Sequence, residues 1–311
     1  MAIIKADGLV KRFGNVVALD ELCLNVERGV TGLIGPNGSG KTTTIGIILG
    51  LLKPDRGEVS VFGLDPWRHG REVRSRIGVL HEKPFFPREM TGRRFLRYVA
   101  SFYGVSDPEA EVGKLLRLLD LEEAADREIK GYSAGMVQRL GIAQALIGDP
   151  ELVILDEPTA NLDPMGRAKV LDLIGSIARD RGKSFLISTH ILSELEKVCW
   201  RVSIIFRGRI LAEGSVSDLM GKFKAEEFEV RAMKIEAAVK LLRHLSSVRD
   251  IRVDGERGTV IVRVHDPTVF QEEALRKAYE MGMHNVSINP RYGVLEAIYR
   301  KVIPSEEGET A

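Results

Sequence analysis

A glycine-rich segment near the start of the chain has the composition of a phosphate-binding loop. It fits G-x-x-x-x-G-K-[ST], follows a predicted strand at 30–34 and opens an apolar helix predicted to end near residue 52. Glycines let backbone N–H groups point inward, and the helix N-terminus adds partial positive charge. Lys41 is expected to reach the β- and γ-phosphates of a nucleotide, and Thr42 to hold Mg²⁺. A glycine-rich turn without a ligand would share the pattern, but the flanking strand and helix favour phosphate binding. The candidate residues are Gly35, Pro36, Asn37, Gly38, Ser39, Gly40, Lys41, Thr42 and Thr43.

Two acidic residues end a second apolar run. Asp156 and Glu157 follow four apolar residues at 152–155, which predicts a buried strand carrying both carboxylates at its C-terminal end. Asp156 is a candidate to anchor Mg²⁺ through a water, and Glu157 to polarise the water that attacks the γ-phosphate. Paired acids are also common on solvated strand ends, so the phosphate loop upstream is what favours the catalytic interpretation.

The segment YSAGMVQR at 132–139 resembles the signature motif of ATP-binding-cassette (ABC) ATPases, usually written LSGGQ-x-QR. Together with the two preceding motifs, it makes residues 1 to about 215 similar to the ATP-binding subunit of an ABC transporter. The resemblance implies that Ser133 and the N–H groups of Gly135 and Met136 form an anion cradle for the γ-phosphate held by a second copy. It therefore implies a head-to-tail dimer with two ATP molecules at the interface.

The same resemblance gives roles to three residues outside these motifs. His190, after a predicted strand at 184–189, matches the histidine that contacts the γ-phosphate. Phe13 matches the aromatic residue that stacks on adenine. Asp163, in Asn161-Leu162-Asp163, matches the loop that communicates across the dimer.

The chain departs from the family pattern at a metal position. Glu82 stands where the Mg²⁺-contacting glutamine is usual. A carboxylate can bind a hard cation, but it adds negative charge beside the triphosphate. We therefore expect retained activity with altered Mg²⁺ dependence or altered coupling. Ala134 and Met136 replace a glycine and the glutamine of the signature, and neither change removes a group responsible for hydrolysis.

Strands that alternate with helices predict an α/β fold, a P-loop NTPase of ABC type over residues 1–220. Its sheet is expected to be mainly parallel and covered on both faces, with antiparallel strands at the N-terminal end. A helical insertion is predicted at about 84–148, with helices at 91–103 and 108–119. Thr91 and Asp107 are the expected N-caps of these two helices.

A second pattern begins after residue 220. Residues 225–303 show the order β-α-β-β-α-β followed by a last helix, which predicts a small α+β ferredoxin-like domain. The segment contains no phosphate loop and no metal-spaced histidine cluster, so its role stays open. The polar tail at 304–311 is predicted to be disordered.

The composition of the chain excludes some classes of binding partner. The 311 residues include 45 basic and 44 acidic side chains, so the net charge of +1 gives no general attraction to DNA or RNA, and no nucleic-acid partner is expected. The apolar runs are too short to cross a bilayer, and the N-terminal residues lack the features of a secretion signal. Cys23 and Cys199 have no partners at metal-ligand spacing. We expect the chain to stay in the cytoplasm.

The form of the signature, Glu82 and the C-terminal VLEAIY at 294–299 resemble the ATPases of ABC-2 type exporters. That resemblance implies ATP and Mg²⁺ as ligands, separate transmembrane permease subunits as partners, and a peripheral position on the cytoplasmic face of the membrane. The alternative is a soluble ABC ATPase acting on a ribosome, iron–sulfur assembly or nucleic-acid complex. A regulatory role of residues 225–303 is compatible with the transporter hypothesis.

Overall fold

The computed structural model describes residues 2–303 except 161, 223–225, 256 and 284. The chain forms two compact units, residues 1–216 (the first unit) and 217–311 (the second unit). Within the described residues, no helix has the length and apolar character needed to span a bilayer. The predicted tail at 304–311 lies outside the described residues.

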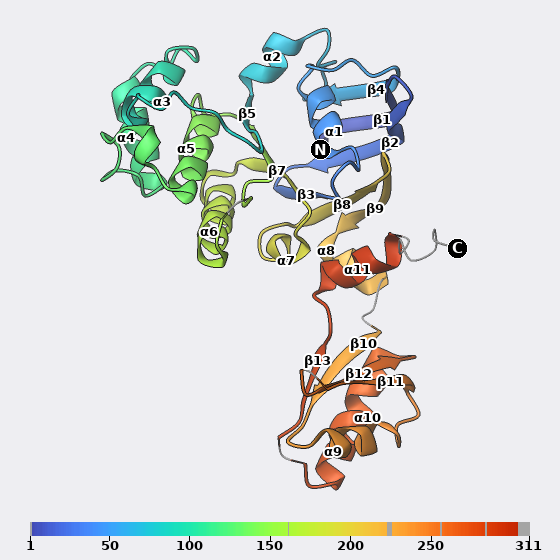
Figure 1. The fold of residues 1–311 in the computed structure, drawn as a ribbon. Helices are drawn as coiled ribbons and strands as arrows, with labels where there is room; N and C mark the ends of the chain where they lie inside the picture. The colour runs from blue at the N-terminus through green and yellow to red at the C-terminus, as the bar shows by residue number, and fades with distance from the viewer. Residues whose placement is uncertain (1, 161, 223–225, 256, 284, 304–311) are drawn as a thin grey trace. The chain divides into compact units, whose positions relative to one another are not determined.

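A six-stranded sheet forms the centre of the first unit, in the order β5-β6-β7-β3-β8-β9 (Figure 1). All neighbouring strands are parallel except β8 and β9, so the predicted, mainly parallel sheet is confirmed. β3, β6 and β7 are buried along their whole length, which explains why apolar residues predominate in them. The strands are β3 (Val30–Ile34), β5 (Ile77–Leu80), β6 (Leu152–Asp156), β7 (Ser184–Thr189), β8 (Arg201–Phe206) and β9 (Arg209–Ser215).

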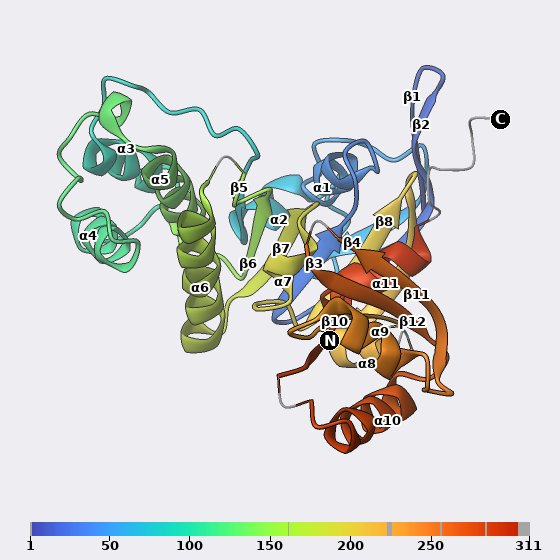
Figure 2. The same ribbon diagram turned by 60° about the horizontal axis from the view of Figure 1, so that its bottom comes forward.

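The N-terminal strands make a separate antiparallel sheet of β1 (Ala2–Phe13), β2 (Val16–Glu27) and β4 (Arg56–Val61). β1 and β2 form a long hairpin, as Figure 2 shows. Its tight turn lies at Gly14 and Asn15. Buried residues of these strands share one hydrophobic core with Leu33 of β3 and with the helix that follows it.

Four helices flank the two sheets: α1 (Lys41–Ile48), α2 (Gly70–Ser75), α6 (Pro164–Arg181) and α7 (Leu192–Leu195). Helix α1 ends four residues before the predicted position. The reason is Gly50, which adopts a left-handed conformation with φ 65°. A Cβ at Gly50 would lie 2.0 Å from the carbonyl oxygen of Pro66, so the chain packs there as only glycine allows.

The helical insertion consists of α3 (Gly92–Ala100), α4 (Pro108–Leu118) and α5 (Ala134–Leu146), with a 3₁₀ turn at Ile129–Gly131. These helices group together in both views (Figure 1 and Figure 2). The predicted N-caps are confirmed, since the Thr91 hydroxyl accepts from the N–H of Arg94 and the Asp107 carboxylate from that of Ala110. Helix α5 also packs closely against the sheet at Gly78 of β5. A Cβ at this position would collide with the Ala145 carbonyl oxygen of α5.

The second unit has the predicted order of elements. α8 (Val216–Lys222) begins at the boundary, and it is followed by β10 (Glu227–Arg231), α9 (Ile235–Leu242), β11 (Val248–Asp254), β12 (Thr259–Val264), α10 (Pro267–Glu280), β13 (Ser287–Pro290) and α11 (Val294–Val302). The sheet order is β11-β12-β10-β13 and every pair is antiparallel. Phe228 and Phe270 meet in its core with ring centroids 4.9 Å apart.

Candidate functional site

The phosphate loop connects β3 to α1, as predicted. Gly38 and Gly40 have φ values of 78° and 110°, a region that disfavours other residues. A Cβ at Gly35 would lie 2.3 Å from the carbonyl oxygen of Ile205, so the loop packs tightly against β8. The buried Lys41 ammonium donates to the carbonyl oxygens of Gly35 at 2.7 Å and Pro36 at 3.3 Å. Two carbonyl groups of the loop thus hold the Lys41 ammonium. The buried Ser39 hydroxyl has no hydrogen-bond partner among the described residues.

A cavity of about 400 Å³ opens beside this loop. Loop residues line it together with Glu82, Asp156 and Glu157, so the structure brings three separate predicted segments to one place. This phosphate-loop cavity is also lined by three β2 residues that the sequence did not single out, Val16, Val17 and Ala18. The one sequence feature that could indicate their position is the turn just before them, which folds β2 back along β1.

Asp156 ends β6 next to the helix that carries Thr42. The Thr42 hydroxyl lies 3.4 Å from one carboxylate oxygen of Asp156, and the Ser188 hydroxyl donates to the other. Ser188 belongs to the neighbouring strand β7 and fixes the carboxylate. No pattern in the sequence indicates this partner, because the contact depends on strand pairing between distant segments.

Glu157 is buried and its backbone is unusual. Its φ is 49°, which costs free energy for a residue with a side chain and persists only where surrounding contacts hold it. The Glu157 N–H donates to the carbonyl oxygen of Ser188 at 3.0 Å. The Glu157 carbonyl oxygen accepts from the buried side-chain amide of Gln138 on α5 at 3.5 Å. These contacts aim the carboxylate into the cavity.

The Glu157 carboxylate lies between two nitrogen groups. Its Oε1 is 3.4 Å from the Lys41 ammonium, and its Oε2 is 3.0 Å from Nδ1 of His190. Oε1 has no hydrogen bond among the described residues, so one buried oxygen of this carboxylate stays available. The structure therefore brings together Lys41, Glu157 and His190, which come from three different parts of the chain.

Three oxygen-bearing residues of the cavity fit a hard divalent cation. Thr42, Glu82 and Asp156 offer a hydroxyl and two carboxylates, the ligand types that Mg²⁺ prefers. Among the described residues, no group of three or more His, Cys, Asp and Glu side chains is arranged to hold a metal ion by itself. A cation here would need further oxygens, which the phosphates of a nucleotide carry.

The signature residues lie at a second cavity of the same unit, of about 470 Å³. Ser133 caps α5 by accepting from the N–H of Met136 at 3.3 Å, and Asp163 caps α6 by accepting from that of Gly166 at 2.9 Å. Ser133, Gly135 and Asp163 line this signature cavity, whereas Met136 does not. None of its lining residues also lines the phosphate-loop cavity, and Asn161 lies outside the described residues.

Phe13 does not line the phosphate-loop cavity. It sits at the end of β1 with an exposed ring, and the Lys11 ammonium lies 5.5 Å from the ring centroid. Residues of β2, which follow the hairpin turn, line the cavity in place of Phe13.

Comparisons with known proteins agree with this geometry. The profile of the ABC transporter family matches residues 19–160. The bacitracin transport ATP-binding protein BcrA of Bacillus licheniformis is 35% identical over 97% of this chain and 97% of its own length. The daunorubicin resistance ATP-binding protein DrrA3 of Streptomyces coeruleorubidus is 34% identical over 95% of this chain and 94% of its own length.

Solved structures resemble about 70% of the chain. One described as the ATP-binding subunit of an ABC transporter superposes with a TM-score of 0.64 at 32% identity, and covers 71% of this chain and 93% of that one. The matching profile, the full-length relatives and the shared fold all point to the same family. The chain therefore belongs to the ABC transporter family, as a nucleotide-binding ATPase subunit that powers transport.

Proposed function

We propose that two copies of this chain form a head-to-tail dimer that binds two ATP and two Mg²⁺, hydrolyses the ATP and drives separate permease subunits of an ABC-2 type exporter from the cytoplasmic face of the membrane. The observation that carries the chemistry is the buried Glu157 carboxylate, held between Lys41 and His190 at the phosphate loop.

At the phosphate-loop cavity, the loop N–H groups and Lys41 bind the β- and γ-phosphates. To do so, the Lys41 ammonium exchanges its contacts with the Gly35 and Pro36 carbonyls for phosphate oxygens. Glu157 accepts a proton from the attacking water through its unoccupied Oε1, and His190 holds the other oxygen in place. The left-handed backbone of Glu157 keeps this geometry before the nucleotide arrives.

Thr42, Asp156 and Glu82 would hold Mg²⁺, which when bound offsets negative charge on the β- and γ-phosphates. Ser188 positions the Asp156 carboxylate for this role by donating a hydrogen bond to it. Phe13 or the β2 residues at the cavity wall would contact the adenine, with Val17 and Ala18 offering apolar surface.

The signature cavity supplies a second set of groups for the γ-phosphate, which the phosphate-loop cavity does not contain. Ser133 and the N–H groups at the start of α5 form a short polar cradle, and Asp163 borders the same cavity. Because the two cavities share no lining residue, the arrangement favours a second copy as the source of the cradle. A head-to-tail dimer brings each cradle to the other copy's γ-phosphate.

The membrane partner follows from the relatives. BcrA and DrrA3 are named for bacitracin transport and daunorubicin resistance, and both align with nearly the whole of this chain. Under this proposal, separate permease subunits supply the translocation path.

A membrane pull-down with the Glu157→Gln variant tests the whole proposal. With ATP and Mg²⁺, this variant should be trapped as a dimer and should retain a polytopic membrane protein. A Lys41→Ala chain, treated in the same way, should fail to dimerise and serves as the matched control. Recovery of ribosomes or other soluble complexes in place of a membrane protein would contradict the transporter assignment but leave the ATPase chemistry standing.

A further inference from the structure

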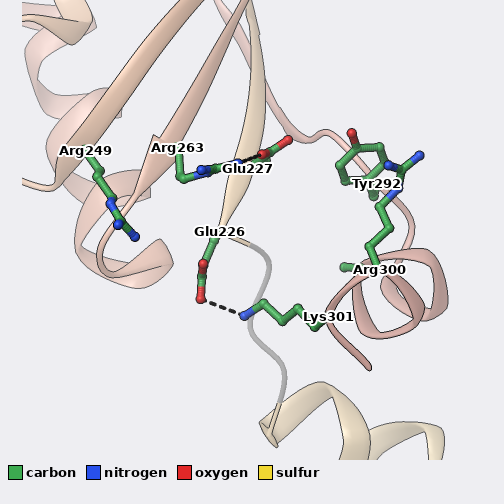
Figure 3. A pocket seen from close by; sticks show the side chains of 8 residues that line it. Glu226, Glu227, Arg249, Arg263, Tyr292, Arg300 and Lys301 are labelled. Carbon is green, nitrogen blue, oxygen red and sulfur yellow. Dashed lines mark hydrogen bonds and ion pairs between the residues drawn. The ribbon is translucent and has the colours of Figure 1, made fainter. Parts of the chain in front are cut away.

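The second unit contains a cavity that the ATPase chemistry does not use (Figure 3). It has a volume of about 300 Å³, at the lower end of the range for small-ligand pockets. Residues of β10, β11, β12 and α11 converge on it from distant parts of the sequence. This second-unit cavity is lined by Glu226, Glu227, Arg249, Arg263, Tyr292, Ala297, Arg300 and Lys301.

The charges around this cavity are unequal. Four cationic side chains and two carboxylates line it, and the carboxylates are already paired. Glu227 accepts from Arg263 at 2.7 Å and from Arg291 at 2.8 Å, and Glu226 lies 2.6 Å from the Lys301 ammonium. The excess charge in the cavity is therefore positive.

Two of the guanidinium groups are held in fixed positions. Burial alone would raise the pKa of Glu227, but the hydrogen bonds from Arg263 and Arg291 outweigh it and hold that pKa below its usual value, so the carboxylate stays charged and keeps Arg263 in place. The Arg300 guanidinium stacks 4.2 Å from the ring centroid of Tyr292 and also contacts Glu296 at 3.1 Å. Each guanidinium has five donors, so both groups retain N–H bonds for a ligand.

Arg249 is the third guanidinium of the cavity, and its side chain points into it from β11 (Figure 3). Within the part of the chain that the structure describes, no hydrogen bond or ion pair engages it. Three guanidinium groups from separate elements line this one cavity, and arginine binds phosphate and carboxylate oxygens in pairs. Since two of them are already oriented, a ligand would have to order only Arg249.

We propose that the second-unit cavity is a binding site for a phosphate group, carried by a small soluble molecule or by a lipid headgroup. The small volume favours a compact dianion over a larger molecule, and the paired carboxylates disfavour a cation. The site is independent of the nucleotide site, which belongs to the first unit.

Hydrogen–deuterium exchange on the full chain tests this proposal with two probes. The first is inorganic phosphate, compared with sodium chloride at equal ionic strength, and the second is phosphatidylcholine vesicles with and without phosphatidic acid. Phosphate binding should slow exchange in peptides covering 226–231 and 291–301, whereas peptides over 35–43 report the phosphate loop separately. Slowing by inorganic phosphate identifies a soluble ligand, and slowing only by phosphatidic acid identifies a headgroup.

Arg249→Gln should weaken the phosphate effect about tenfold, the loss expected for one charge-assisted contact. Arg300→Gln should weaken the phosphate effect as well, and it tests a cavity residue on a different element, α11. Arg252→Gln is the matched control, since Arg252 lies on the same strand, pairs with Asp250 and does not line the cavity. No slowing by either probe, or equal slowing in wild type and Arg249→Gln, would overturn the proposal.

Discussion

Two carboxylates of this molecule each lie between two basic groups, yet their surroundings differ. Glu157 faces Lys41 and His190 in the first unit, and its side chain is only 9% exposed. Glu227 faces Arg263 and Arg291 in the second unit, and both of its oxygens accept hydrogen bonds there. Glu157 keeps one oxygen without a hydrogen bond and has a strained backbone. A satisfied carboxylate holds its neighbours in place, whereas an unsatisfied buried one is suited to take a proton.

The largest effect that this comparison predicts is on catalysis. Glu157→Gln should lower the ATPase rate by roughly a thousandfold, because the amide cannot act as a general base. Nucleotide affinity should stay close to that of the wild type, as measured by calorimetry with ATP and Mg²⁺. A variant that hydrolyses ATP at the normal rate would remove Glu157 from the mechanism.

Lys41→Ala should weaken ATP binding by roughly a hundredfold, because a buried cation that contacts phosphate is lost. The same change leaves Glu157 without its nearest cation at 3.4 Å. Lys41→Arg serves as the control that keeps the charge but changes its shape. Unchanged ATP affinity in Lys41→Ala would contradict the phosphate-loop assignment.

Glu227→Gln should reduce the stability of the second unit by about 1–2 kcal/mol at neutral pH, with no change in ATPase rate. The folded-state pKa of Glu227 is lowered, since the two arginine hydrogen bonds outweigh the effect of burial. Its stabilising contribution is therefore present above the unfolded-state pKa and is lost as the pH falls through the folded-state pKa. Native-state hydrogen exchange over β10 at neutral and acidic pH measures this. A difference between variant and wild type that grows with acidity would contradict it.

The smallest effect is expected at Glu82, which is exposed at the edge of the phosphate-loop cavity. Glu82→Gln should raise the Mg²⁺ concentration for half-maximal ATPase activity by about two- to fivefold, the size expected for an exposed charge. Titration of ATPase activity with Mg²⁺ at fixed ATP measures the shift. A change in the opposite direction would show that the Glu82 charge opposes binding of the metal complex.

Much of the first unit was predictable because its motifs are local. The phosphate loop joins a strand to a helix, and the two acids end a buried strand, as the sequence patterns indicate. Helix ends were harder to predict. α1 stops at Ile48 because Gly50 turns the chain beside Pro66, a contact between segments that no local pattern reveals.

The sequence by itself determined the local backbone of the phosphate loop and of the helix caps, whereas the left-handed conformation of Glu157 depends on contacts with distant segments. Glycine spacing, a lysine and the capping residues Ser133 and Asp163 act on neighbours within a few positions, so they can be recognised without tertiary structure. Only the tertiary structure decided which side chains meet. The contacts of Glu157 with His190 and Gln138, the β2 wall of the phosphate-loop cavity and the converging arginines of the second unit all depend on strand order and helix packing. Such contacts join residues far apart in the chain, and their positions follow from burial of the whole core rather than from local sequence.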